Sequence, residues 1–124
     1  MERTYAEYAA HQAVELLAID SPTGFTHNAA DRVMEVLSGL GYTPALTRKG
    51  GVLCCLNPDA PEADALLLEA HVDTLGGMVA EVKGDGRLRI TNIGGMNANN
   101  AEAENVRIRT YDGACYDGTL QLID

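Results

Sequence analysis

The sequence predicts an α/β segment followed by an all-β segment, and three observations lead to this fold class. Two stretches near the N-terminus space their apolar residues as amphipathic helices do. An apolar run of strand type follows them and ends in a His-x-Asp sequence. Beyond it, short strand-like stretches follow one another with turn signals and no helix between them, which is typical of a small barrel or sandwich. We therefore place the domain boundary near residues 75–77, with residues 1–75 in the α/β part and residues 76–124 in the β part.

Two helices are expected in the N-terminal part. The first covers residues 4–18, and the second covers residues 29–40 with Asn28 as its cap. Gly41 is placed to end the second helix at the C′ position, where a left-handed backbone is common. Two histidines lie off the apolar stripe or in the intervening loop and are interpreted as surface residues: His11 and His27.

The remaining regular stretches are expected to be strands. Lys49-Gly50-Gly51 is a hairpin signal between residues 42–47 and residues 52–56. Residues 65–70 are apolar throughout, as expected of a central strand whose two faces are covered by other elements. The β part then contains a polar loop at residues 97–105 and four short strands, which are expected at residues 78–82, 87–91, 106–110 and 115–122.

His71 and Asp73 follow the apolar run and are the candidate site residues. Side chains at positions i and i+2 of a strand point to the same face, and ligand sites of open α/β folds lie at the carboxyl ends of strands. A neutral imidazole is a common metal ligand, and a carboxylate on its other nitrogen fixes the tautomer. By itself, His-x-Asp also fits a surface polar pair or a hydrogen-bonded loop. Glu69 shares the predicted face and fits a solvated strand residue equally well.

Four motifs carry a resemblance to a known family. They are Ser21-Pro22-Thr23-Gly24, Gly39-Leu40-Gly41-Tyr42, the stretch from Glu69-Ala70-His71-Val72-Asp73 through Gly76-Gly77-Met78-Val79, and Ile93-Gly94-Gly95-Met96. In this order and at about this spacing, the chain resembles the glutamyl-aminopeptidase and tetrahedral-aminopeptidase family of dinuclear-zinc metallopeptidases, some of which carry an endoglucanase label. The resemblance covers nearly the whole chain but only about the first third of a family member.

The resemblance implies a fold and a partial site. Residues 1–75 would be the N-terminal portion of a zinc-peptidase α/β domain with two helices and a mixed sheet, and residues 76–124 would be part of a β-barrel-like oligomerisation domain. His71 would bind one metal, Asp73 would orient it, and the loop at residues 21–24 would lie near the substrate cleft. The complete family site holds two metals, zinc or cobalt here, and one histidine does not distinguish these from manganese.

The family's other ligands and its general base come later in the family sequence, so at most a partial site is expected here. Three other acidic residues have no spacing that argues for a cluster: Asp20, Asp64 and Glu81. No substrate-binding residue is assigned.

These observations predict an N-terminal fragment of a metal-dependent aminopeptidase, which removes N-terminal residues from peptides with a metal-activated water. The sequence ends within a stretch that has the residue pattern of a strand, which favours truncation. The isolated chain is expected to be inactive. One alternative is a non-catalytic interaction module whose β half mediates assembly. A second is an endoglucanase-like glycosidase, which needs two carboxylates about 5–10 Å apart.

Composition limits the partners and the compartment. The net charge of -9 and only 9 basic residues argue against nucleic acids and anionic membranes as partners. The sequence has no apolar signal region and no apolar run of membrane-spanning length, so the cytoplasm is the expected compartment. A homo-oligomer is expected, because unpaired sheet edges promote pairing with another chain. The 3 cysteines are interpreted as buried reduced thiols in strands.

Overall fold

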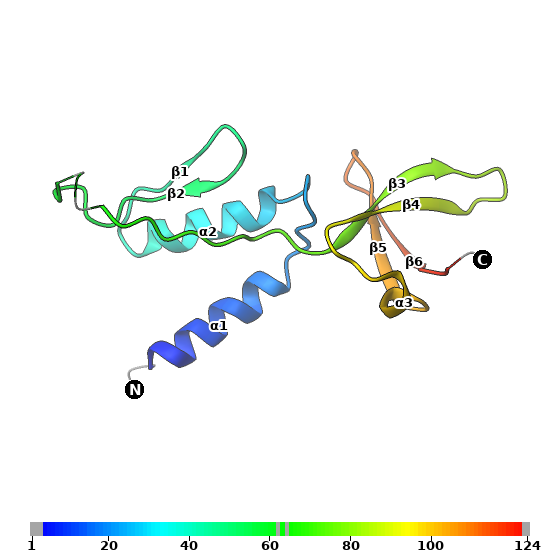
Figure 1. Ribbon diagram of the computed structural model, residues 1–124, viewed down its shortest axis with the longest axis horizontal. Helices are drawn as coiled ribbons and strands as arrows, with labels where there is room; N and C mark the ends of the chain where they lie inside the picture. The colour runs from blue at the N-terminus through cyan, green and yellow to red at the C-terminus, as the bar shows by residue number, and fades with distance from the viewer. Residues whose placement is uncertain (1–3, 62, 64, 123–124) are drawn as a thin grey trace. The chain divides into compact units, whose positions relative to one another are not determined.

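The computed structural model describes residues 4–61, 63 and 65–122. The chain divides into two compact units, Met1–Leu75 and Gly76–Asp124. The described residues form a mixed α/β structure with three helices and three separate two-stranded antiparallel sheets (Figure 1). Asp64 and residues 123–124, which follow the last predicted strand, lie outside the described residues.

Helix α1 (Tyr5–Leu17) begins with a capping box. The hydroxyl of Thr4 accepts a hydrogen bond from the backbone N–H of Glu7, and the Glu7 carboxylate accepts one from the backbone N–H of Thr4. This reciprocal pair satisfies two of the amides that a helix start leaves without partners. The first predicted helix is therefore confirmed.

Helix α2 (His27–Gly39) packs its start into the small core of the first unit, where Ala29 and Ala30 are buried. It begins earlier than expected, with Thr26 as N-cap, because the N–H of Ala30 already donates to the Thr26 carbonyl at 3.0 Å. The prediction of Asn28 as the cap is wrong for this reason.

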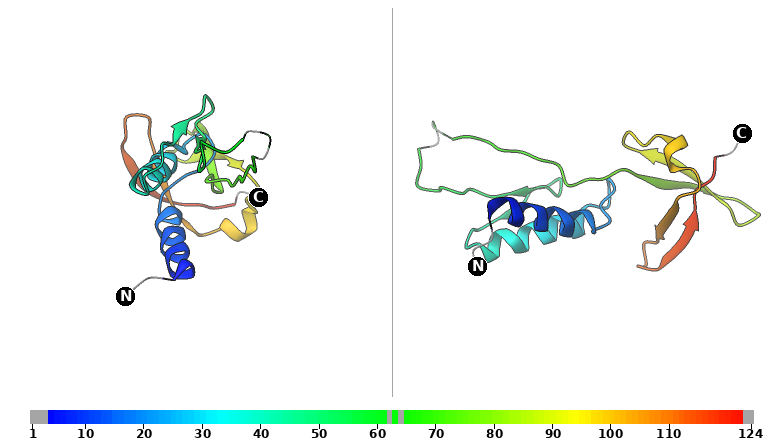
Figure 2. Two further views of the ribbon diagram at one scale, coloured as in Figure 1. Left: turned by 90° about the vertical axis from the view of Figure 1, so that its left-hand side faces the viewer. Right: turned by 90° about the horizontal axis from the view of Figure 1, so that it is seen from below.

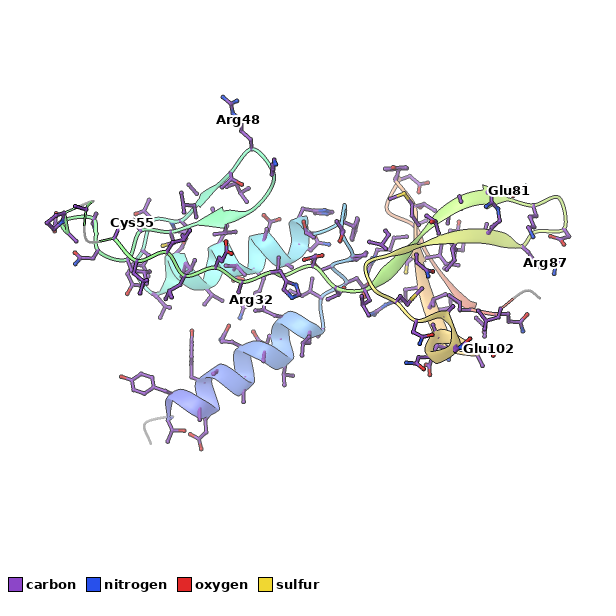
Figure 3. All side chains as sticks on the ribbon, viewed as in Figure 1. Arg32, Arg48, Cys55, Glu81, Arg87 and Glu102 are labelled. Atoms are coloured by element: carbon purple, nitrogen blue, oxygen red, sulfur yellow. The ribbon has the colours of Figure 1, made fainter. Side chains whose placement is uncertain are left out.

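Ion pairs of Arg32 and a C-terminal capping motif fix the position and the end of α2. Arg32, labelled in Figure 3, pairs with Glu15 of α1 and with Glu35 at 2.8 Å. At its end, Gly41 has a φ of 91°, and its N–H donates to the Ser38 carbonyl at 2.9 Å. The N–H of the next residue donates to the Leu37 carbonyl at 3.1 Å, which completes a Schellman motif. The predicted C′ glycine is confirmed.

The hairpin of β1 (Ala45–Leu46) and β2 (Val52–Leu53) is present but shorter than predicted. The N–H of Thr47 donates to the Gly51 carbonyl at 2.8 Å and closes the loop, and Figure 3 shows Arg48 at its tip.

The cysteines differ from the expectation of buried thiols in strands. All three are free, Cys54 is half-buried beyond the end of β2, and the others, Cys55 and Cys115, are exposed.

Residues 65–70 do not form a strand, so the prediction of a covered central strand is wrong for this chain. Figure 2 shows this stretch as an extended trace, and its three leucines, 82%, 73% and 78% exposed, are Leu66, Leu67 and Leu68. A strand needs a neighbour for its backbone hydrogen bonds, and no described strand pairs with this one. The mixed sheet is therefore not formed, and all the described sheets are antiparallel.

The second unit contains the four predicted strands as two hairpins. Strand β3 (Gly76–Val82) pairs with β4 (Leu88–Ile93), and β5 (Asn105–Arg109) pairs with β6 (Cys115–Thr119). The predicted polar loop contains a short helix, α3 (Ala98–Ala101), capped by an asparagine. A barrel requires strands joined into a closed ring, and no such closure is seen among the described residues.

A β-bulge gives the β3–β4 hairpin one apolar face. The register shifts between Val79 and Glu81, so that Val79 lies opposite Ile90 and Val82 lies opposite Leu88. Ile90 and Leu88 are two residues apart on β4 and share a face. The extra residue in β3 therefore brings both valines to that same face. Without the bulge, Val82 would lie on the opposite face.

Candidate active site

The candidate site lies in the first unit, where a loop from the N-terminal part meets residues 71–74. Pro22 and Thr74 form an isolated parallel β-bridge, and the N–H of Thr74 donates to the Ser21 carbonyl at 2.7 Å. The N–H of Phe25 donates to the Pro22 carbonyl at 2.8 Å, which turns the loop into the start of α2. Two segments about fifty residues apart in sequence are therefore held side by side.

Ser21 is the most buried polar residue at this junction. It is 1% exposed, and its side-chain oxygen has no hydrogen-bond partner among the described residues. Its carbonyl carries the link to Thr74 instead, so the contribution of this residue to the site is a backbone one.

His71 and Asp73 lie together, as the sequence predicts for an i, i+2 pair. The Nδ1 atom of His71 lies 2.9 Å from the backbone carbonyl oxygen of Asp73 and 3.2 Å from its Oδ1. Both neighbours accept hydrogen bonds, so Nδ1 carries the proton of the neutral ring and Nε2 keeps its lone pair. This is the tautomer that a metal ligand binding through Nε2 requires.

Asp73 is anchored on its other side by the loop. The hydroxyl of Thr23 donates to Oδ2 of Asp73 at 2.8 Å. This hydrogen bond is the main reason why the pKa of the Asp73 carboxyl is held below its ordinary value. The electrostatic interaction with His71 lowers the pKa further, and partial desolvation acts in the opposite direction. The carboxylate is thus in its ionised form at neutral pH and serves as an acceptor with both oxygens.

An open groove of about 570 Å³ runs past these residues. It is lined by the loop with Thr23, the first turn of α2 with His27, the β1–β2 turn with Lys49, and the segment that carries His71 and Asp73. The sequence resemblance places the loop at residues 21–24 near a cleft. The role of Thr23 itself was not predicted, because no local pattern pairs two residues fifty positions apart.

The structure describes the surroundings of two other acidic candidates. Glu69 is exposed, and Glu81 accepts a hydrogen bond from Arg89 at 2.9 Å. In the part of the chain that the structure describes, no group of three or more His, Cys, Asp or Glu residues is arranged to hold a metal ion. The donor set therefore fits one imidazole ligand with its orienting carboxylate and does not complete a metal centre, for which three protein ligands are usual.

No helix within residues 4–61, 63 and 65–122 combines the length and the apolar character needed to cross a membrane.

Comparison with known proteins gives consistent matches along most of the chain. Residues 50–124 match the family described as M42 glutamyl aminopeptidase. YhfE of Bacillus subtilis (strain 168), a protein named as an aminopeptidase, is 41% identical over 108 residues, which is 87% of this chain and 31% of that protein.

Two further relatives carry names that specify an amino acid. The glutamyl aminopeptidase of Lactococcus lactis subsp. cremoris (strain MG1363) is 30% identical over 66% of this chain and 23% of its own length. The lysyl aminopeptidase of Pyrococcus furiosus is 30% identical over 79% of this chain and 28% of its own length. The chain thus spans less than a third of the curated relatives it matches. Since the family match covers residues 50–124 and includes His71 and Asp73, the chain belongs to the M42 glutamyl aminopeptidase family of metal-dependent peptidases.

Proposed function

We propose that this chain forms part of the active site of an aminopeptidase, with His71 as a ligand of one metal and Asp73 as the carboxylate that orients the ligand. The observation that carries this proposal is the position of Nδ1 between two acceptors of Asp73, which leaves Nε2 free to bind a metal beside an open groove. The aminopeptidase names of the relatives support the reaction class.

When bound, the metal would supply an activated water for attack on a peptide carbonyl. The residues of this chain would prepare the site. Asp73 keeps the proton on Nδ1 and holds the ring, and the groove provides space for the peptide. Zinc or cobalt in a two-metal site is the proposed cofactor. Because the described residues supply a single ligand, the remaining ligands and the general base would come from outside them.

Hydrolysis of aminoacyl p-nitroanilides with added zinc, cobalt or manganese tests this proposal. The first step is to measure the intact mass of the protein as its source cell makes it, because this mass decides which molecule is assayed. In that protein, Asp73→Asn should lower activity about 10- to 100-fold, as loss of an orienting partner does, and His71→Ala should abolish it. His11→Ala, which removes an exposed imidazole that pairs with Glu15 at 3.6 Å, is the control and should have no effect.

The purified 124-residue chain should release no p-nitroaniline above the metal-only blank. Metal-dependent release by this chain that is lost in His71→Ala would show that it forms a complete site and would overturn the proposal of outside ligands. The same samples assayed on soluble cellulose examine the glycosidase alternative, for which we expect no hydrolysis.

We also propose that the protein is a cytoplasmic homo-oligomer and that the second unit, as part of a barrel-like domain, mediates the assembly. The supporting observation is the apolar face of the β3–β4 hairpin, on which Val79 and Val82 are 42% and 72% exposed. Exposed apolar surface of this kind is typical of an interaction site.

A further inference from the structure

The contacts of Asp73 extend the candidate site to a third residue. One carboxylate joins two segments, because Oδ2 accepts the Thr23 hydroxyl at 2.8 Å while Oδ1 lies 3.2 Å from Nδ1 of His71. Resting on the function proposed above, we propose that Thr23 is a positioning residue, whose hydroxyl fixes the Asp73 carboxylate and through it the ring orientation and tautomer of His71.

The carboxylate needs a second anchor because its own torsion is soft. The terminal torsion of an aspartate side chain has broad, roughly two-fold minima. The side chain of Asp73 is 43% exposed, and that of His71 is 85% exposed. Contact with an exposed imidazole does not restrict such a group to one orientation. A hydroxyl donor from a different segment does, because it fixes the second oxygen in space.

The backbone holds Thr23 in place to act in this way. Its neighbour Pro22 forms the β-bridge to Thr74, and the Ser21 carbonyl accepts the Thr74 N–H at 2.7 Å. Gly24, with a φ of 91°, turns the chain immediately after Thr23. These backbone contacts do not involve the Thr23 hydroxyl, so removing the hydroxyl should leave the loop in position.

A competing arrangement is also visible. The backbone carbonyl of Asp73 lies 2.9 Å from the same Nδ1 atom and is an acceptor on its own. If this carbonyl alone held the ring, the Thr23 hydroxyl would have no influence on His71. The experiment must therefore read the state of the ring directly.

Long-range ¹H–¹⁵N correlation of the metal-free chain at pH 8, where an unperturbed imidazole is neutral, gives that reading. In the wild type, the His71 Nε2 resonance should lie in the unprotonated range and Nδ1 in the protonated range. Thr23→Val should move the two shifts toward each other, as the ring exchanges with the Nε2–H form that free imidazole prefers. Thr23→Ser keeps the hydroxyl and should retain the wild-type shifts.

Thr26→Val is the matched control, since Thr26 also lines the groove and its side chain makes no cap hydrogen bond. It should leave the His71 shifts unchanged. Unchanged His71 shifts in Thr23→Val would overturn the proposal, as would an equal change in Thr26→Val. If valine disturbs the α2 amide signals, Thr23→Ala provides the same reading with less bulk. Because no metal and no substrate are present, this result is independent of whether the protein is an aminopeptidase.

Discussion

At the residue scale, the turn between β3 and β4 shows how a local ion pair can set a measurable pKa. Asp85 accepts hydrogen bonds from the Nε of Arg87 at 2.7 Å and from its backbone N–H at 3.0 Å. Figure 3 shows Arg87 at the turn end of this hairpin. These bonds favour the charged carboxylate, so the pKa of Asp85 is lowered, with the side-chain bond as the largest cause.

We expect Arg87→Ala to raise the pKa of Asp85 toward its ordinary value, as measured by NMR titration of the carboxyl carbon. Because the folded pKa is depressed, the pair stabilises the hairpin above about pH 4, and this contribution is lost as the pH falls through the lower folded pKa. Arg89→Ala is the control, since Arg89 pairs with Glu81. An equal effect of both substitutions would mean that net charge, and not this contact, sets the pKa.

The candidate site divides at the same scale into what sequence could and could not predict. His71 and Asp73 are two positions apart, and strand-like alternation places them together even though no strand forms. Their contact with Thr23 depends on a β-bridge between segments fifty residues apart. Local periodicity carries no information about such a pairing, and only the family resemblance placed the loop near the cleft.

At the element scale, two glycines at the end of α2 differ in backbone conformation. Gly41 has a φ of 91°, whereas Gly39 is the last residue of the helix, and a Cβ added to either would meet no atom within 4 Å beyond its chain neighbours and the helix's own backbone. Only backbone conformation therefore distinguishes them. Gly41→Ala should lower the free energy of unfolding by about 1–2 kcal/mol, and Gly39→Ala should raise it by about 0.5–1 kcal/mol.

Urea denaturation followed by far-ultraviolet circular dichroism measures both changes. The wild type and the two variants should show similar denaturant slopes, so that the midpoints report stability. Similar midpoints for the two variants would indicate that the helix end frays and that the Schellman motif contributes little.

The elements themselves were predicted where local signals specify them. Helical spacing and turn glycines are local, and the helices and hairpins formed within a few residues of the expected bounds. The prediction of a strand at residues 65–70 is wrong because apolar character predicts burial, whereas burial as a strand depends on neighbouring strands that no local signal specifies. The leucines of this segment are exposed, so its composition suits a strand in a sheet but does not specify the strands that it would pair with.

At the scale of the whole molecule, the proposed assembly follows from the face created by the β-bulge. Val82 is 72% exposed on that face, and Met78, on the same strand, is 54% exposed. Met78 is one residue from Val79, so its side chain lies on the opposite face of the hairpin. The two residues are similar in exposure and apolar character and differ in the face that they occupy.

We expect the wild type to sediment as an oligomer at tens of micromolar, a concentration at which weak specific interfaces are populated (roughly 10 to 100 μM). Val82→Lys should shift the distribution toward the monomer, because a charge buried in an apolar interface without a partner is costly. Met78→Lys adds the same charge to the other face and should leave the distribution unchanged. A monomeric wild type would contradict the proposed assembly, and dissociation by Met78→Lys alone would assign the interface to the opposite face of the hairpin.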